Sequence, residues 1–183
     1  MAQLLPAVKA EFAKSQPDLT PWWKQVEGWR TTYRGLFPDA FLDGLDEAAR
    51  ASYWRGTLPA TEGRHTLLAH ESEDAVGFVS GGPARDQQGF EAEVYAIYLL
   101  SKARRRGTGR RLMARMFGRF AEDRRRSAHL WVHEGNVAGE AFYAKLGGKP
   151  GARENHERPA PHTGVSYGWD EAGIARVAAM DAA

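Results

Sequence analysis

Five arginines surround two glycines in the stretch ARRRGTGRRLM, which spans residues 103–113. The stretch follows the apolar run YAIYLL and precedes apolar residues at helical spacing, so we expect it to link a strand to a helix. The N-terminus of a helix exposes unpaired N–H groups and carries roughly half a positive charge, which suits an anion. Gly107 and Gly109 let such a ligand approach the backbone closely. The pattern therefore predicts a cradle for a phosphate-bearing ligand.

The arginines alone are equally typical of a nucleic-acid-binding surface. Ten of them lie between residues 104 and 126, but the formal net charge of the chain is only +2, so its basicity is local. The loop lacks the Gly-Lys-Ser/Thr ending of a Walker loop, and no third glycine completes a dinucleotide-binding fingerprint. Arg104 stands three residues before Gly107, and the form Arg-x-x-Gly-x-Gly is much more specific than its glycines alone. A basic nucleic-acid-binding module stays the less favoured interpretation.

This pattern resembles the acetyl-CoA loop of the Gcn5-related N-acetyltransferases (GNAT), which has the form Gln/Arg-x-x-Gly-x-Gly/Ala. The segment EVYAIYLLSKARRRGTGRRLM is similar to the family's central strand, pyrophosphate loop and following helix. The segment LWVHEGNVAGEAFYAKLGG is similar to its second conserved block, where an asparagine stands seven residues before a tyrosine, as Asn136 does before Tyr143. The two blocks cover residues 91–148. Ser101 departs from the family pattern, in which proline is common at that position.

The resemblance implies transfer of an acetyl group from acetyl-CoA to a primary amine by direct attack, with no metal. It implies that Tyr143 protonates the departing thiolate. The implied acetyl-CoA-binding residues are Ile97 and Leu99 through their backbone, then Arg104, Arg105, Arg106, Gly107, Thr108, Gly109, Arg110 and Asn136. The implied acceptor is the amine of a small molecule or peptide, and the sequence leaves the acyl chain and a homodimeric state open.

A general base is useful to this reaction, because an alkylamine with a pKa near 10 is only about 0.1% neutral at pH 7. Glu93 is the first candidate, since it matches a catalytic glutamate of related histone acetyltransferases, and it would act through water. Strand alternation predicts that one face of this strand carries Glu91, Glu93, Tyr95 and Ile97. Glu91 is the weaker candidate of the two glutamates. His133, at the end of the next strand, is an alternative base.

Each of these residues also has a purely structural interpretation. The two glutamates could solvate the start of a strand, Tyr143 could be a core residue beside Phe142, and Asn136 could be only an N-cap. Trp29 and Tyr33 are weak candidates for an acceptor pocket, because aromatic residues at helical spacing belong more often to the core. The six histidines show no metal-binding spacing, and the absence of cysteine excludes a thiol nucleophile and a cysteine-ligated zinc site.

The elements that must position these residues follow from hydrophobic periodicity. We expect helices over residues 22–36, 39–54 and 109–126 and in NVAGEAFYAKLGG, and strands in HTLLAHE, AVGFVSGG, FEAEVYAIYLL and SAHLWVHE and over residues 150–156 and 164–169. The first strand that is usual in the resembled family is hard to place within residues 3–8. The fold class is α/β (α+β): a mixed, mostly antiparallel sheet of six to seven strands flanked by helices, with one parallel pair around the arginine-rich helix.

A chain of 183 residues with 43% hydrophobic and 26% charged residues suits one domain. Within it we expect acceptor-side helices over residues 18–56, a cofactor-binding core over 64–148 and C-terminal strands over 149–170. The sequence shows neither a signal peptide nor an apolar run of about 18 residues, which favours a cytoplasmic protein without a membrane partner. A fold of this kind that binds acyl-CoA without turnover, as a sensor, is the other alternative.

Overall fold

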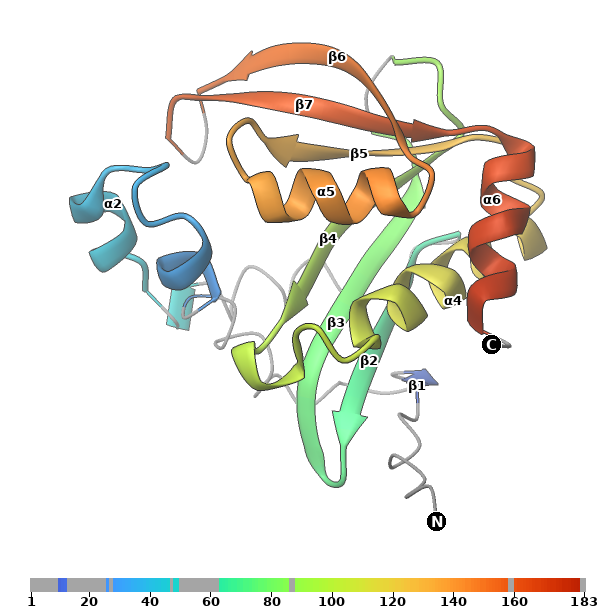
Figure 1. The fold of residues 1–183 in the computed structure, drawn as a ribbon, viewed down its shortest axis with the longest axis horizontal. Coiled ribbons are helices and arrows are strands. Elements are labelled where there is room, and N and C mark those ends of the chain that lie inside the picture. The colour runs from blue at the N-terminus through green and yellow to red at the C-terminus, as the bar shows by residue number, and fades with distance from the viewer. Residues whose placement is uncertain are drawn as a thin grey trace.

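The computed structural model describes residues 10–12, 26, 28–46, 48–49, 63–85, 88–157 and 160–181. Its centre is a seven-stranded sheet in the order β1-β2-β3-β4-β5-β7-β6 (Figure 1). The strands are β1 (Ala10–Phe12), β2 (His65–Glu71), β3 (Asp74–Pro83), β4 (Ala92–Leu99), β5 (Ala128–His133), β6 (Lys149–His156) and β7 (His162–Trp169). Every neighbouring pair is antiparallel except β4 and β5. The predicted mixed sheet with one parallel pair is confirmed.

The described helices lie on both sides of this sheet and at its ends. They are α2 (Asp39–Asp43), α4 (Thr108–Glu122), α5 (Val137–Lys145) and α6 (Glu171–Ala178), with short 3-10 turns at Ser101–Ala103 and Ala179–Asp181. In Figure 1, α2 lies at one end of the molecule and α4 and α6 at the other, with α6 packed on α4. The sequence analysis did not predict α6. None of the described helices is long and apolar enough to span a bilayer.

The main core forms where α4 packs on the sheet. The apolar side chains of α4 that are buried there are Leu112, Met113, Met116, Phe117 and Phe120. The helix ends at Glu122, four residues before the expected end, because Arg124 takes a left-handed conformation with φ 59°. The N–H of Arg125 then bonds the carbonyl of Phe120 at 2.8 Å, which closes the helix.

The interior of α4 contains a glycine with room for a side chain. A Cβ placed on Gly118 would meet no atom within 4 Å. Because glycine disfavours a helix interior relative to alanine, we expect Gly118→Ala to raise the free energy of unfolding by about 0.5–1 kcal/mol. In thermal unfolding followed by circular dichroism, the Tm should rise by about 2–4 °C. A lower Tm for this variant would contradict the helical environment described for Gly118.

The N-terminal helices differ from their predicted bounds. The first helical segment leaves the helix after Thr32, before the predicted end at residue 36, and its predicted start lies outside the described residues. The predicted helix over residues 39–54 is wrong as a single helix, because α2 ends at Asp43 with Gly44 as its C-cap. Asp46 then accepts a hydrogen bond from the N–H of Ala48 at 2.8 Å, which starts a new helical turn. Residues 50–54 lie outside the described residues.

A β-bulge in β4 changes which of its residues share a face. Ser80 of β3 pairs with Ala96, but the next residue, Gly81, pairs with Val94, so Tyr95 is the extra residue. Val94 before the bulge and Ile97 after it both pack into the core with α4. The prediction that Glu93 and Ile97 lie on one face is therefore wrong, because the bulge shifts the alternation by one residue.

Candidate active site

The two parallel strands at the centre of the sheet pair only at their beginnings. Ala92 pairs with Ala128 and Glu93 with His129, and no later residue of β4 has a ladder partner in β5. From there β4 and β5 run in different directions, and α5 lies alongside β5 in front of β4 (Figure 1). The edge of β4 that faces β5, including Ile97 and Leu99, is therefore available to pair with an extended ligand, as an added strand would.

The loop after β4 leads into the N-terminus of α4, where the backbone geometry suits an anion. Arg105 and Gly107 have left-handed backbones, with φ 61° and 84°. Among the described residues, none accepts a hydrogen bond from the backbone N–H groups of residues 105–110, and the N–H of Arg111 is the first to bond back, to Gly107 at 3.0 Å. Successive unpaired N–H groups at a left-handed turn form an anion-binding concavity.

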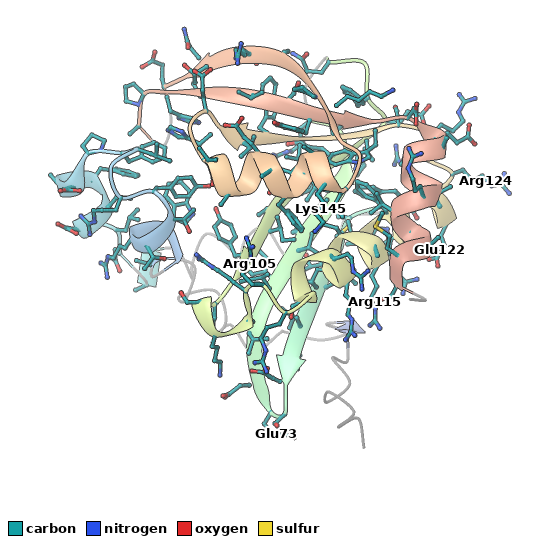
Figure 2. The ribbon with its side chains drawn as sticks, viewed as in Figure 1. Glu73, Arg105, Arg115, Glu122, Arg124 and Lys145 are labelled. Atoms are coloured by element: carbon teal, nitrogen blue, oxygen red, sulfur yellow. The ribbon has the colours of Figure 1, made fainter. Side chains whose placement is uncertain are left out.

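The arginines of this loop divide into two kinds. Arg104 donates from Nε to the carbonyl of Leu99 and from Nη2 to Thr32 Oγ1, both at 3.1 Å, so it ties the loop to β4 and to the N-terminal helical segment. Arg106 pairs with Glu71 at 2.8 Å. Arg105 and Arg110 have no side-chain bond to any residue in the described ranges. Figure 2 shows Arg105 beneath α5, near the middle of the molecule.

Three of the six remaining arginines of the basic stretch form ion pairs among the described residues. Arg115 contacts Asp181 at 2.9 Å, Arg119 contacts Glu122, and Arg126 contacts Glu91. Arg124 projects outward at the edge of the molecule in Figure 2. These pairs offset part of the positive charge of the stretch. Arg126 also donates its backbone N–H to the carboxylate of Glu91. This hydrogen bond lowers the pKa of the Glu91 carboxyl and makes it a weaker base.

The second predicted block places Tyr143 beside this loop. Helix α5 starts at Asn136, whose Oδ1 accepts a hydrogen bond from the N–H of Gly139 at 3.1 Å. Gly109, at the start of α4, allows the close approach of α5, because a Cβ there would lie 3.3 Å from Phe142 Cζ. The ring of Tyr143 lies next to that residue, at the inner side of the same helix. Burial, with a smaller contribution from Tyr98, raises the pKa of Tyr143.

Tyr98 joins Tyr143 to the N-terminal aromatic residues. Its hydroxyl accepts a hydrogen bond from Trp29 Nε1 at 2.6 Å. The pKa of Tyr33 is raised by burial, then by its interactions with Tyr98 and Tyr143. The structure therefore places Trp29 and Tyr33 beside Tyr98, and Tyr33 within electrostatic reach of Tyr143. The sequence analysis missed Tyr98, because the bulge at Tyr95 hides which face Tyr98 occupies.

Glu93 lies at the paired end of β4, and its side chain is buried. Arg85 holds it with three donors: its backbone N–H at 3.1 Å, Nε at 3.0 Å and Nη2 at 2.5 Å. The side chain of Glu93 is 4% exposed. Arg85, which the sequence analysis did not single out, therefore controls the orientation of the glutamate that the resemblance identifies as a base.

His133 ends β5 at the far side of the site, where Phe37 covers its ring at a centroid distance of 4.7 Å. Among the described residues no group of three or more histidine, aspartate or glutamate side chains could hold a metal ion.

The family comparison agrees with the geometry of this loop. The model of the acetyltransferase (GNAT) family matches residues 26–148, which include β4, the loop, α4, β5 and α5. The uncharacterized N-acetyltransferase YuaI of Bacillus subtilis (strain 168) is 32% identical to this chain over 149 residues. The match covers 80% of this chain and 83% of that protein.

Two solved structures share the fold. A GNAT-family protein from Desulfovibrio desulfuricans superposes with a TM-score of 0.68 at 20% identity, covering 90% of this chain and 99% of its own. The yncA protein of Salmonella typhimurium, solved with its cofactor acetyl-CoA, gives a TM-score of 0.61 at 17% identity, covering 90% of this chain and 94% of its own. The chain therefore belongs to the GNAT family of acetyltransferases, enzymes that take an acyl group from acyl-CoA.

Proposed function

We propose that this protein transfers an acetyl group from acetyl-CoA to a primary amine of a small molecule or peptide. The observation that carries the proposal is the loop at residues 105–110, whose N–H groups have no acceptor among the described residues and which lies beside the unpaired edge of β4. The yncA protein, which has the same fold, was solved with acetyl-CoA. Family membership supports an amine as the acceptor.

We assign acetyl-CoA to the loop and to the gap between the parting strands. The pyrophosphate would accept hydrogen bonds from the backbone of residues 105–110, with Arg105 and Arg110 adding charge. The pantetheine would run along the free edge of β4, near Ile97 and Leu99, and an N–H near Leu99 would stabilise the developing oxyanion. Asn136 uses its Oδ1 as a helix cap, so its Nδ2 is the group assigned to the pantetheine.

Arg104 and Arg106 already form hydrogen bonds or ion pairs within the protein, and we assign them supporting roles in the loop. Arg104 would hold the loop against Leu99 and Thr32, as its hydrogen bonds indicate, and would contribute its charge to the pyrophosphate from that position. Arg106 would anchor the outer side of the loop through Glu71. In this assignment the backbone supplies more of the binding than any one side chain.

We assign Tyr143 as the acid that protonates the departing thiolate. Its raised pKa keeps the hydroxyl protonated at neutral pH, so a proton is always present to donate. A phenol with a raised pKa is a weaker acid, but the same apolar surroundings raise the pKa of the buried thiol, which in water is near 8.5. Burial therefore raises the pKa of the proton donor and the pKa of the proton acceptor together.

Two groups are candidates for the proton acceptor on the amine side. Glu93 has the position that the resemblance gives to a catalytic glutamate, and its partner Arg85 would have to share it with a water molecule. His133 lies on the opposite side of the site, beside Tyr33 and Phe37.

The direct test is turnover of acetyl-CoA against a panel of amines, followed by release of the CoA thiol, with acetyl-CoA binding measured by calorimetry. The panel should include polyamines, amino acids, aminoglycosides and peptides with free N-termini or lysines. We expect binding and amine-dependent thiol release. If acetyl-CoA does not bind, the proposed function is wrong. If it binds and no amine releases thiol, the non-catalytic sensor is the better description.

A further inference from the structure

Three histidines meet at one end of the sheet, where β5 and β6 end and β7 begins. The rings of His133 and His162 are stacked, with centroids 5.2 Å apart and planes 11° from parallel. The ring of His156 lies 5.1 Å from that of His162. Phe37 meets His133 edge-on, and Tyr33 lies 5.9 Å from it. The imidazole of His133 is thus held among rings rather than in open solvent.

The hydrogen bonds of these rings fix which nitrogen carries the proton. His133 Nδ1 lies 2.5 Å from the carbonyl oxygen of Glu134, and His162 Nδ1 lies 2.8 Å from that of Ala160. A carbonyl oxygen can only accept, so Nδ1 is the protonated nitrogen of each neutral ring and Nε2 carries the lone pair. His133 Nε2 is buried and finds no hydrogen-bond partner in the described part of the chain. Buried polar atoms are nearly always satisfied, so this lone pair is available to a ligand or a water molecule.

His133 lies close to the reacting groups of the proposed mechanism. Its ring neighbours Tyr33, which interacts with both Tyr98 and Tyr143. The amine adds to one face of the planar thioester carbonyl, so in the tetrahedral intermediate its nitrogen and the leaving sulfur are separate substituents that need separate proton-transfer groups. With Tyr143 assigned to the sulfur, the ammonium proton needs another acceptor, and His133 lies across Tyr33 from Tyr143.

Glu93 is poorly placed for the same proton. Arg85 already donates to both of its carboxylate oxygens. Glu93 is the register partner of His129, and His133 is four residues further along β5. Four residues of a strand span about 13 Å, so the two groups cannot both contact one amine. The strands are still paired at Glu93 and have separated at His133.

We propose that Nε2 of His133 is the general base, which accepts a proton from the ammonium group of the acceptor. This assignment rests on the proposed function. Nε2 takes one proton from the ammonium group and leaves a neutral amine. The amine lone pair forms the C–N bond as the thioester carbonyl becomes tetrahedral, and collapse of that intermediate breaks the C–S bond. Tyr143 gives its proton to the sulfur and is reprotonated by the second amine proton through solvent. The imidazolium then loses its proton to water.

Phe37, which is 5% exposed, packs edge-on against the His133 ring. Residues 33–37 form a turn held by bonds from the N–H groups of Leu36 and Phe37 to the carbonyl of Tyr33, rather than a continuous helix. The titratable groups that face the His133 ring are His162 from β7 and Tyr33 from this turn. The carboxylate of Glu134 is engaged by Arg153 at 3.1 Å.

The kinetic test compares His133→Asn and Glu93→Gln, with His70→Asn on β2 as a matched control outside the site. The best amine from the panel is used, and kcat is measured from pH 5.5 to 9.5 together with acetyl-CoA affinity. We expect His133→Asn to lower kcat by about 10²-fold, to remove the acid-side fall that a histidine base produces, and to leave acetyl-CoA affinity unchanged. Glu93→Gln should keep that acid-side fall, and His70→Asn should behave as the wild type.

A second measurement does not depend on turnover or on the stability of the variants. In wild-type protein with nitrogen-15-labelled histidine, NMR should show His133 in the Nδ1–H tautomer, with a lone pair at Nε2. The Nε2–H tautomer would overturn the proposal, as would a His133→Asn variant that keeps both the wild-type kcat and its acid-side fall. If acetyl-CoA binds and no amine reacts with wild-type protein, it is the proposed function that fails instead.

Discussion

Replacing Tyr143 with phenylalanine should lower kcat by about 10²-fold while leaving the affinity for acetyl-CoA within about twofold of the wild type. The substitution removes one hydroxyl and keeps the ring that packs against Tyr167 at a centroid distance of 5.9 Å. Loss of the proton donor therefore affects the breakdown of the tetrahedral intermediate and not cofactor binding. Steady-state kinetics of thiol release, with calorimetry for acetyl-CoA, measures both quantities.

The pH dependence of the wild type checks the same assignment. Burial raises the pKa of Tyr143 above the ordinary tyrosine value of about 10, so its proton is retained as the pH rises through that value. We expect no alkaline decline of kcat attributable to this group below about pH 10. A decline near pH 8 that disappears in Tyr143→Phe would contradict the burial of the hydroxyl.

The matched control for Tyr143 is its neighbour Tyr167. Tyr167 is buried in the same core and carries a hydroxyl that interacts with Glu140, but it lies on β7. Tyr167→Phe should therefore change stability without a comparable loss of kcat. If the two variants lose activity equally, the effect of Tyr143 is one of packing, and the acid must be another group.

Replacing Gly107 with valine should weaken acetyl-CoA binding by about tenfold or more. Gly107 has φ 84°, and a Cβ there would meet no atom within 4 Å, so the backbone conformation rather than space demands glycine. A left-handed conformation costs an L-residue roughly 1–2 kcal/mol, and more when it is β-branched. A valine variant whose loop relaxes to avoid this cost no longer aims its N–H groups as in the structure, so the dissociation constant should rise by about tenfold or more.

Asparagine at the same position is the control for the glycine. Asparagine tolerates the left-handed region better than other residues with a Cβ, so Gly107→Asn should bind acetyl-CoA more tightly than Gly107→Val. Calorimetric titration with acetyl-CoA ranks the three proteins directly. Equal affinities for all three would mean that the loop backbone does not hold the pyrophosphate.

The fold was predictable from the sequence to the extent that its elements are local. The strands β2, β5 and β7, the helix α5 with its Asn136 cap, and the glycine loop before α4 all fall within two or three residues of their predicted bounds. Periodicity, caps and turn residues act over a few neighbouring positions, and they identify such elements well. The tail helix α6 was missed, although Asp170 caps it by accepting from the N–H of Gly173.

The errors arose where longer-range contacts override local pattern. The bulge at Tyr95 depends on the register between β3 and β4, and strict alternation cannot reveal it. At the break after Asp43, Arg30 donates to the carbonyls of Leu42, Asp43 and Leu45, which lie 12 to 15 positions away. The bulge changed the face that Ile97 occupies.

The sequence by itself determined the local form of the loop before α4, because Arg104, Gly107 and Gly109 act within one turn. Only the tertiary structure decided what the charged and aromatic groups contact. Arg104 bonds Thr32, 72 positions away, and Trp29 bonds Tyr98, 69 positions away. Such partners depend on how the sheet twists and where β4 and β5 part. The tertiary structure also distinguishes the two candidate bases that the sequence proposed. Glu93 is held by Arg85, whereas Nε2 of His133 has no hydrogen-bond partner among the described residues.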